Sequence, residues 1–180
     1  GFKPDFQLEL QSNKSFHKHI TSRNWVQGII HGFLWLMLLY NLLLFIMSRD
    51  RVYLYYSLYI FFVAVNFLTE KGILLENLLK NIPVFNDYLF VIATGILSMF
   101  YIQFFRRFLD TQKMMPKWDI AHKTVIGIKG AEMVVLLLLM LISYNVPAMI
   151  NISNISNLLL LGYGMAFIYG LLKYSRNRLA

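Results

Sequence analysis

The sequence predicts an all-α polytopic transmembrane bundle of about five helices, preceded by a short extended N-terminal tail. Three observations predict this fold class: few charged residues, five long apolar runs, and short polar connections between the runs. Hydrophobic residues make up 58% of the chain and charged residues 14%, whereas a soluble domain carries about 45–50% and about 25%. A soluble surface would need more charge, so lipid is the expected solvent.

Five apolar runs are long enough to cross a bilayer, which takes about 20 residues in a helix. They cover residues 25–47, 52–69, 88–108, 125–144 and 155–174, within a membrane domain expected over residues 24–180. Several runs contain valine and isoleucine, which favour strands locally. A helix is still expected, because only a helix satisfies all its backbone N–H and C=O groups inside lipid without a partner segment.

Residues 1–23 precede the first apolar run. Phe6, Leu8 and Leu10 alternate with polar residues, and this period of two is typical of a half-buried β-strand. We therefore expect residues 1–23 to form an extracytoplasmic tail, at the end of an upstream β-rich domain. An extended linker would explain the same pattern equally well.

The distribution of lysine and arginine predicts the orientation. Basic residues gather between the first two runs, between the third and fourth, and after the fifth, whereas residues 145–154 carry no charge. Basic connections mark the cytoplasmic side, so the N-terminus is expected outside and the C-terminus inside. Because the net charge of +8 is divided among connections and forms no single basic face, the expected partner is membrane lipid and not nucleic acid.

Five polar residues inside the apolar runs are candidate intramembrane contacts: Lys129, Glu132, His31, Asn41 and Asn66. Lys129 and Glu132 are three residues apart and share a helix face, so they could form a polar switch between two signalling states. Alternatively, Lys129 snorkels to the cytoplasmic interface, since its run begins near residue 125, with Glu132 paired to it. His31 could hydrogen-bond a neighbouring helix or be a proton-sensitive contact. Both asparagines could form hydrogen bonds to a neighbouring helix through their side-chain amides.

Four glycines are candidates for helix packing. Gly28 and Gly32 are four residues apart, and Gly162 and Gly170 flank Ala166 at the same spacing, which lets helices approach closely. The contact could join two copies in a homodimer, as a receptor would use, or pack helices within one bundle.

No catalytic, cofactor-binding or metal site is expected in this chain. It has no cysteine, and it lacks a phosphate-binding glycine loop, a zinc-protease helix motif and a nucleophile elbow. His17 and His19 have no third ligand nearby in the sequence. The chain is therefore not expected to be an enzyme itself.

The first two runs and the turn between them carry a distinctive pattern. A glycine-bearing first run ends in a Tyr-Asn pair, and an Arg-Asp turn then leads into a tyrosine-rich second run: Tyr40, Asn41, Arg49, Asp50, Tyr53, Tyr55 and Tyr56. In this pattern the chain resembles the membrane domain of bacterial seven-transmembrane receptors with diverse intracellular signalling modules. The resemblance covers about residues 24–174.

The resemblance implies a signal relay in the bacterial inner membrane. It would couple an extracytoplasmic sensor to a cytoplasmic output module such as a histidine kinase, a diguanylate cyclase or a phosphatase. The family has seven helices and this chain has five runs, so two further helices are expected beyond residue 180. The alternative function is a subunit or fragment of a transporter or channel, which would require a polar, water-accessible pathway.

Overall fold

The computed structural model describes residues 13–70, 83–143 and 146–179. In these ranges the chain forms helices and short turns, and no strand. The helices are α1 (Asn13–Ser48), α2 (Arg51–Glu70), α4 (Pro83–Phe108), α5 (Thr111–Met114), α6 (Pro116–Ser143) and α7 (Val146–Leu179). The all-α prediction is confirmed for the described part of the chain, and the strand expected near residues 6–11 lies outside it.

Five of these helices are long and apolar enough to cross a membrane. The candidate spans among the described residues are Trp25–Ser48, Arg51–Glu70, Val84–Phe108, Pro116–Ser143 and Ala148–Tyr174. The first two match the predicted runs to within a residue. The expectation of a multi-pass membrane protein with about five helices is thus confirmed.

Several helices extend beyond the predicted runs. Residues 13–23, which the sequence analysis placed in the extended tail, form the first turns of α1. Helix α6 begins at Pro116, nine residues before the run that predicted it, and the first helical position is one that tolerates proline. Residues 146–154, expected in an uncharged connection, belong to α7. Hydropathy marks the apolar stretch and therefore misses polar helix turns at its ends.

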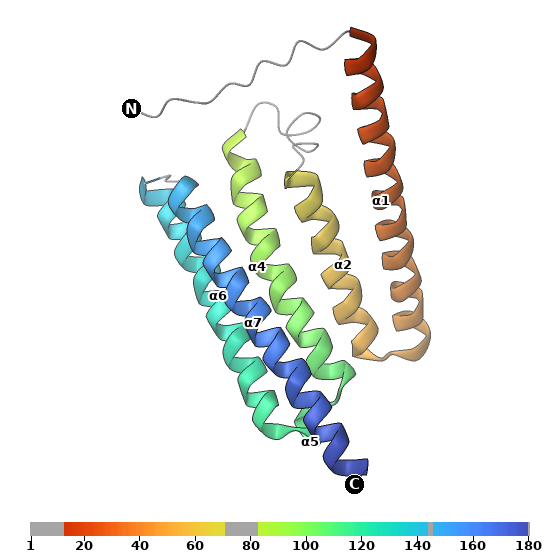
Figure 1. The fold of residues 1–180 in the computed structure, drawn as a ribbon, viewed down its shortest axis with the longest axis vertical. Helices are drawn as coiled ribbons and strands as arrows, with labels where there is room; N and C mark the ends of the chain where they lie inside the picture. Colours follow the sequence, from red (N-terminus) through yellow and green to blue (C-terminus); the bar gives the residue numbers. More distant parts are fainter. Residues whose placement is uncertain (1–12, 71–82, 144–145, 180) are drawn as a thin grey trace.

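Helices α1, α2, α4 and α6 lie in a row, and α7 packs across the end of that row (Figure 1). Helix α1 forms one edge and contacts only α2 among the described helices. The single turn of α5 joins α4 to α6. The backbones of α6 and α7 lie close together at few positions, so side chains make most of their contacts. A cavity lies among α4, α6 and α7.

The turn between α1 and α2 explains the Arg-Asp pair of the sequence pattern. Arg49 has φ 57°, a left-handed conformation that reverses the chain. Asp50 precedes α2, and its Oδ1 accepts a hydrogen bond from the Val52 N–H at 2.9 Å. An aspartate in this position satisfies one of the free N–H groups at a helix start. The turn residues therefore fix α1 and α2 as an antiparallel hairpin.

Aromatic rings fill the interface between α2 and α4. Tyr56 packs on Phe104 with ring centroids 4.9 Å apart, and Tyr59 packs on Tyr101 at 5.4 Å. Tyr55 faces Phe100 at 6.3 Å. The tyrosines of the second predicted run thus hold two spans together.

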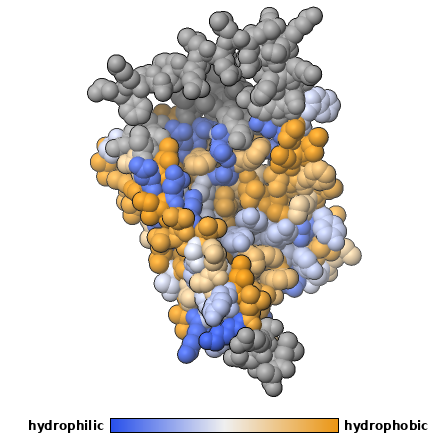
Figure 2. Space-filling model, viewed as in Figure 1, coloured by the Kyte–Doolittle hydropathy of each residue, from blue (hydrophilic) through white to orange (hydrophobic). Residues whose placement is uncertain are grey.

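Large apolar side chains remain exposed on the outer faces of the spans. Met47 and Ile142 are each 81% exposed, and Leu141 is 72% exposed. Figure 2 shows apolar residues over much of the visible face and hydrophilic residues toward both its upper and lower ends. An exposed apolar surface of this extent is unfavourable in water and matches lipid as the solvent.

Candidate functional site: a polar cluster between α6 and α7

Lys129 lies at the centre of α6. It is 13 residues after Pro116 and 14 residues before Ser143, which at about 1.5 Å per residue is about 20 Å from either end. Only 4% of the residue is exposed. Lys129 is therefore not at a helix end, because α6 starts earlier than its apolar run. Snorkelling of Lys129 to the interface stays a prediction.

The Lys129 ammonium group has three donors, and each has an acceptor. Its Nζ donates to Glu132 Oε2 at 2.9 Å, to Ser156 Oγ at 2.9 Å and to Asn157 Oδ1 at 3.2 Å. The first acceptor is on α6 and the other two are on α7. A buried lysine is costly unless paired, so these three bonds make its burial tolerable.

Glu132 completes the arrangement. Its Oε2 accepts from both Lys129 Nζ and the hydroxyl of Ser156, and its side chain is 13% exposed. We name Lys129, Glu132, Ser156 and Asn157 the polar cluster. It contains one positive and one negative charge and links α6 to α7 through side chains alone.

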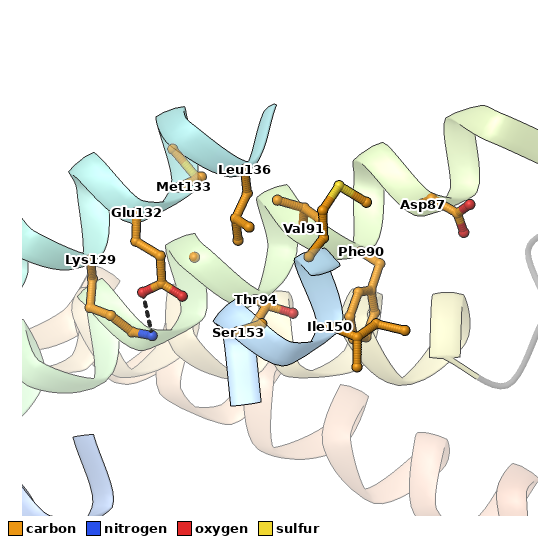
Figure 3. Close-up of a pocket in the computed structure, with 12 residues that line it drawn as sticks. Asp87, Phe90, Val91, Thr94, Lys129, Glu132, Met133, Leu136, Ile150 and Ser153 are labelled. Atoms are coloured by element: carbon orange, nitrogen blue, oxygen red, sulfur yellow. Dashed lines mark hydrogen bonds and ion pairs between the residues drawn. The ribbon is translucent and has the colours of Figure 1, made fainter. Parts of the chain in front are cut away.

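A cavity of about 130 Å³ lies beside the polar cluster, among α4, α6 and α7 (Figure 3). Lys129 and Glu132 form a polar part of its wall together with Thr94 and Ser153. Most of the remaining wall is apolar, including Phe90, Val91, Met133, Leu136 and Ile150. The cavity leaves room for side chains of the cluster to rearrange without first displacing packed groups.

A second group of charged residues joins α4, α5 and α6, and we name it the α5 ion cluster: Arg106, Thr111, Asp119 and Lys123. Asp119 is 3% exposed; its carboxylate accepts from Arg106 Nε and Nη2, and from the hydroxyl of Thr111. Lys123 Nζ lies 3.0 Å from Asp119 Oδ2. These bonds attach the turn that contains α5 to both α4 and α6.

His122 lies next to this cluster, 2% exposed. Its Nδ1 is 2.6 Å from the Trp118 carbonyl oxygen and 2.7 Å from the Tyr163 hydroxyl on α7. Phe167 packs edge-on against the imidazole at 4.5 Å. His122 therefore forms a second side-chain link between α6 and α7, about two turns from the polar cluster.

The other predicted polar residues divide into two kinds. Asn66 Nδ2 donates to Thr94 Oγ1 at 2.6 Å, an interhelical bond from α2 to α4. Asn41 instead donates to the Met37 carbonyl of its own helix at 2.7 Å. His31 Nδ1 lies 3.3 Å from the Gln27 carbonyl in the same helix, and its ring packs against Phe67 on α2 at 5.0 Å. For Asn41 and His31 the expected interhelical hydrogen bond is absent in the described part of the chain.

One of the four predicted packing glycines makes a close contact. A Cβ at Gly170 would lie 2.6 Å from Trp118 Cζ2, whereas Cβ atoms at Gly28, Gly32 and Gly162 would meet nothing within 4 Å. Within the described residues those three positions therefore pack on no helix, and a contact with a second copy stays a prediction. A Cβ at Gly95, which was not among the predicted glycines, would lie 2.8 Å from Met133 Sδ.

Sequence reasoning missed Asp119, His122, Tyr163, Ser156 and Asn157. The first two lie before the apolar run that defined the fourth predicted helix. Ser156 and Asn157 stand at the start of the fifth run, where two adjacent polar residues in a span were an available signal for a buried partner. Their pairing with a lysine 27 and 28 residues away could not be read from spacing.

Comparison with known proteins agrees with this architecture. Neither a search of curated proteins nor a search of solved structures gave a match. The model of the family described as 7TM diverse intracellular signalling matches residues 23–180. This match spans all five membrane helices and confirms the resemblance seen in the Tyr-Asn and Arg-Asp pattern. The chain belongs to the 7TM diverse intracellular signalling family and is a multi-pass transmembrane signalling domain.

Proposed function

We propose that this domain is the transmembrane relay of a receptor in the bacterial inner membrane, with its N-terminus outside and its C-terminus in the cytoplasm. It couples an extracytoplasmic sensor to a cytoplasmic output module by moving α7 relative to α6. The observation that carries this proposal is the polar cluster, a buried ion pair at mid-helix that joins two spans. Family membership supports the signalling role.

A relay needs two arrangements with different contacts, because a signal acts only through differential free energy between them. Residues 151–157 of α7 read Asn-Ile-Ser-Asn-Ile-Ser-Asn, so the Ser-Asn pair that binds Lys129 is repeated three residues earlier as Ser153 and Asn154. Ser153 already lines the cavity beside Glu132 (Figure 3). The repeat gives Lys129 a second set of acceptors of the same chemistry.

In the second arrangement, Lys129 binds Ser153 and Asn154 in place of Ser156 and Asn157. The exchange requires a three-residue shift of α7, which is about 4.5 Å along its axis with a rotation of about 60°. Shifts of about one helix turn between packed elements are a known form of switching. The ion pair of Lys129 with Glu132 persists in both arrangements, so no buried charge is left unpaired.

Spin labels can measure this shift directly, because the chain has no native cysteine. One label pair is placed on α6 and α7 at Ile128→Cys and Leu161→Cys, both exposed positions. Replacement of Ser156 by Ala and Asn157 by Leu removes the present acceptors and should move the distance distribution of this pair by several ångströms. The matched substitutions Ser153→Ala and Asn154→Leu should leave the present α6–α7 label distance as the main peak of the distribution.

A reference pair on α2 and α4, Arg51→Cys with Arg107→Cys, should not move in either variant. An unchanged α6–α7 distribution after the Ser156 and Asn157 substitutions would exclude the register shift. The relay role itself is tested in the full-length receptor: Glu132→Gln should change output, and unchanged output would remove the polar cluster from signalling.

Thiol labelling distinguishes the relay from the transporter or channel alternative. Asn41, Asn66 and Gln103 already have hydrogen-bond partners within the bundle. Cysteines at these positions are expected to be protected from a membrane-impermeant reagent. Rapid reaction at all three would indicate a water-filled pathway and favour transport.

A further inference from the structure

We propose that a groove between the start of α6 and the end of α7 is a binding site for an anionic phospholipid. The groove has a volume of about 570 Å³, within the usual range for ligand sites. Its walls include Met115, Lys117 and Trp118 on one side, and Tyr169, Gly170 and Lys173 on the other. It shares no lining residue with the cavity beside the polar cluster.

The indole of Trp118 lines the groove. This ring lies directly against the α7 backbone at Gly170, where a Cβ would come within 2.6 Å of Trp118 Cζ2. Phe167, one turn earlier on α7, packs edge-on against the indole at 5.2 Å. Because α7 holds the ring through both contacts, this wall of the groove is preformed.

The charges of the groove are unbalanced. Lys117 and Lys173 are both exposed, and no acidic residue lines the groove with them. The nearby carboxylates have other partners, since Asp119 pairs with Arg106 and Lys123, and Asp110 pairs with Lys113. Two lysines without an acidic partner in the described part of the chain are suited to a phosphate group.

The remaining walls are suited to an acyl chain. Met114, Ala166 and Tyr169 are exposed and apolar or aromatic. A phosphate compound without a hydrocarbon tail would leave these side chains uncovered. A ligand that satisfies both parts has an anionic head and a hydrocarbon tail. Basic pockets between transmembrane helices at a membrane surface bind anionic lipid headgroups in this way, and tryptophan and tyrosine are enriched at that depth.

Quenching of Trp118 fluorescence by brominated lipids tests the site. The other tryptophans, Trp25 and Trp35, are replaced by phenylalanine, and the chain is placed in nanodiscs of phosphatidylcholine with a minor fraction of phosphatidylglycerol. Brominated phosphatidylglycerol should quench Trp118 more strongly than brominated phosphatidylcholine at the same fraction. Each of Lys117→Gln and Lys173→Gln should lower the apparent preference for phosphatidylglycerol about fivefold.

A charge-matched control separates the groove from the general surface potential. The double variant Arg51→Gln with Arg107→Gln removes two exposed charges outside the groove and should keep the preference. An equal loss in this control, or equal quenching by both lipids in the parent chain, would overturn the proposal. Competition by inorganic phosphate, compared with chloride of equal ionic strength, would show that a free anion suffices and would also overturn it.

Discussion

The interface between α2 and α4 and the interface between α6 and α7 use different chemistry. Between α2 and α4, aromatic rings pack along the helices, and two hydrogen bonds accompany them, from Asn66 to Thr94 and from Asn86 to the Thr69 carbonyl. Between α6 and α7, an ion pair with two further acceptors, a histidine–tyrosine contact and the rings of Trp118 and Phe167 bridge helices whose backbones lie close together at few positions. The first interface is continuous and mostly apolar, and the second is discontinuous, polar near the middle of α6 and aromatic near its start.

This difference indicates which interface can change. Close-packed rings lose many contacts at once when helices slide, so the packed arrangement is strongly preferred. Hydrogen bonds from one lysine can instead be exchanged for bonds to equivalent acceptors one turn away. We therefore expect α1, α2 and α4 to act as a fixed support, against which α7 moves along α6. The following predictions test that contrast.

The largest effect is expected for Lys129→Met. The substitution leaves the Glu132 carboxylate buried without its ion-pair partner, and breaking one side of a buried pair costs about 3–5 kcal/mol. The free energy of unfolding in mixed detergent micelles measures the loss. Adding Glu132→Leu should recover most of it, because a buried pair replaced by apolar groups is often neutral.

The matched control for Lys129 is Lys123→Met on the same helix. The Lys123 side chain is 55% exposed, and its carboxylate partner Asp119 keeps Arg106, so a change below about 1 kcal/mol is expected. A cost for Lys129→Met no larger than this control would contradict the importance of the polar cluster for the α6–α7 interface.

The next effect is expected for Asp119→Asn in the α5 ion cluster. The amide keeps one acceptor oxygen but loses the charge that pairs with Arg106, and charged hydrogen bonds contribute about 1.5–3 kcal/mol. Hydrogen exchange over residues 106–119 should accelerate. Asp110→Asn is the control: its pair with Lys113 is exposed, and asparagine also adopts the left-handed conformation found at Asp110, so exchange should stay unchanged.

A smaller effect is expected for Tyr56→Leu between α2 and α4. The substitution keeps an apolar side chain but removes the ring pair with Phe104, and such pairs contribute about 0.5–1.5 kcal/mol beyond their buried area. Tyr40→Leu is the control, because Tyr40 is 60% exposed on α1. Unfolding free energies that fall equally in both variants would show that ring packing does not hold α2 on α4.

The smallest effect is expected for Asn66→Leu. Interhelical hydrogen bonds in membranes average about 0.6 kcal/mol and reach about 2, since the unfolded state in a membrane also finds partners. A double-mutant cycle with Thr94→Val isolates the bond. A coupling energy as large as that between Lys129 and Glu132 would remove the contrast between the two interfaces.

The apolar runs alone determined the five spans, because in lipid only a helix of sufficient length satisfies its backbone groups without a partner segment. The Arg-Asp turn likewise marked the first hairpin, since its cap and left-handed residue act locally. Both features depend on neighbours in the chain, so the printed sequence is enough to find them.

The tertiary structure decided which polar side chains meet. The sequence alone places Lys129 near the start of its apolar run, whereas the structure shows that α6 starts at Pro116 and that α7 supplies Ser156 and Asn157 as acceptors. Asn41 and Asn66 look alike in the sequence, yet one bonds its own helix and the other bonds α4. Gly28 and Gly170 also look alike, and only Gly170 has Trp118 against it. The physical reason is that these contacts depend on the rotation and separation of helices distant in the chain, which hydropathy does not encode.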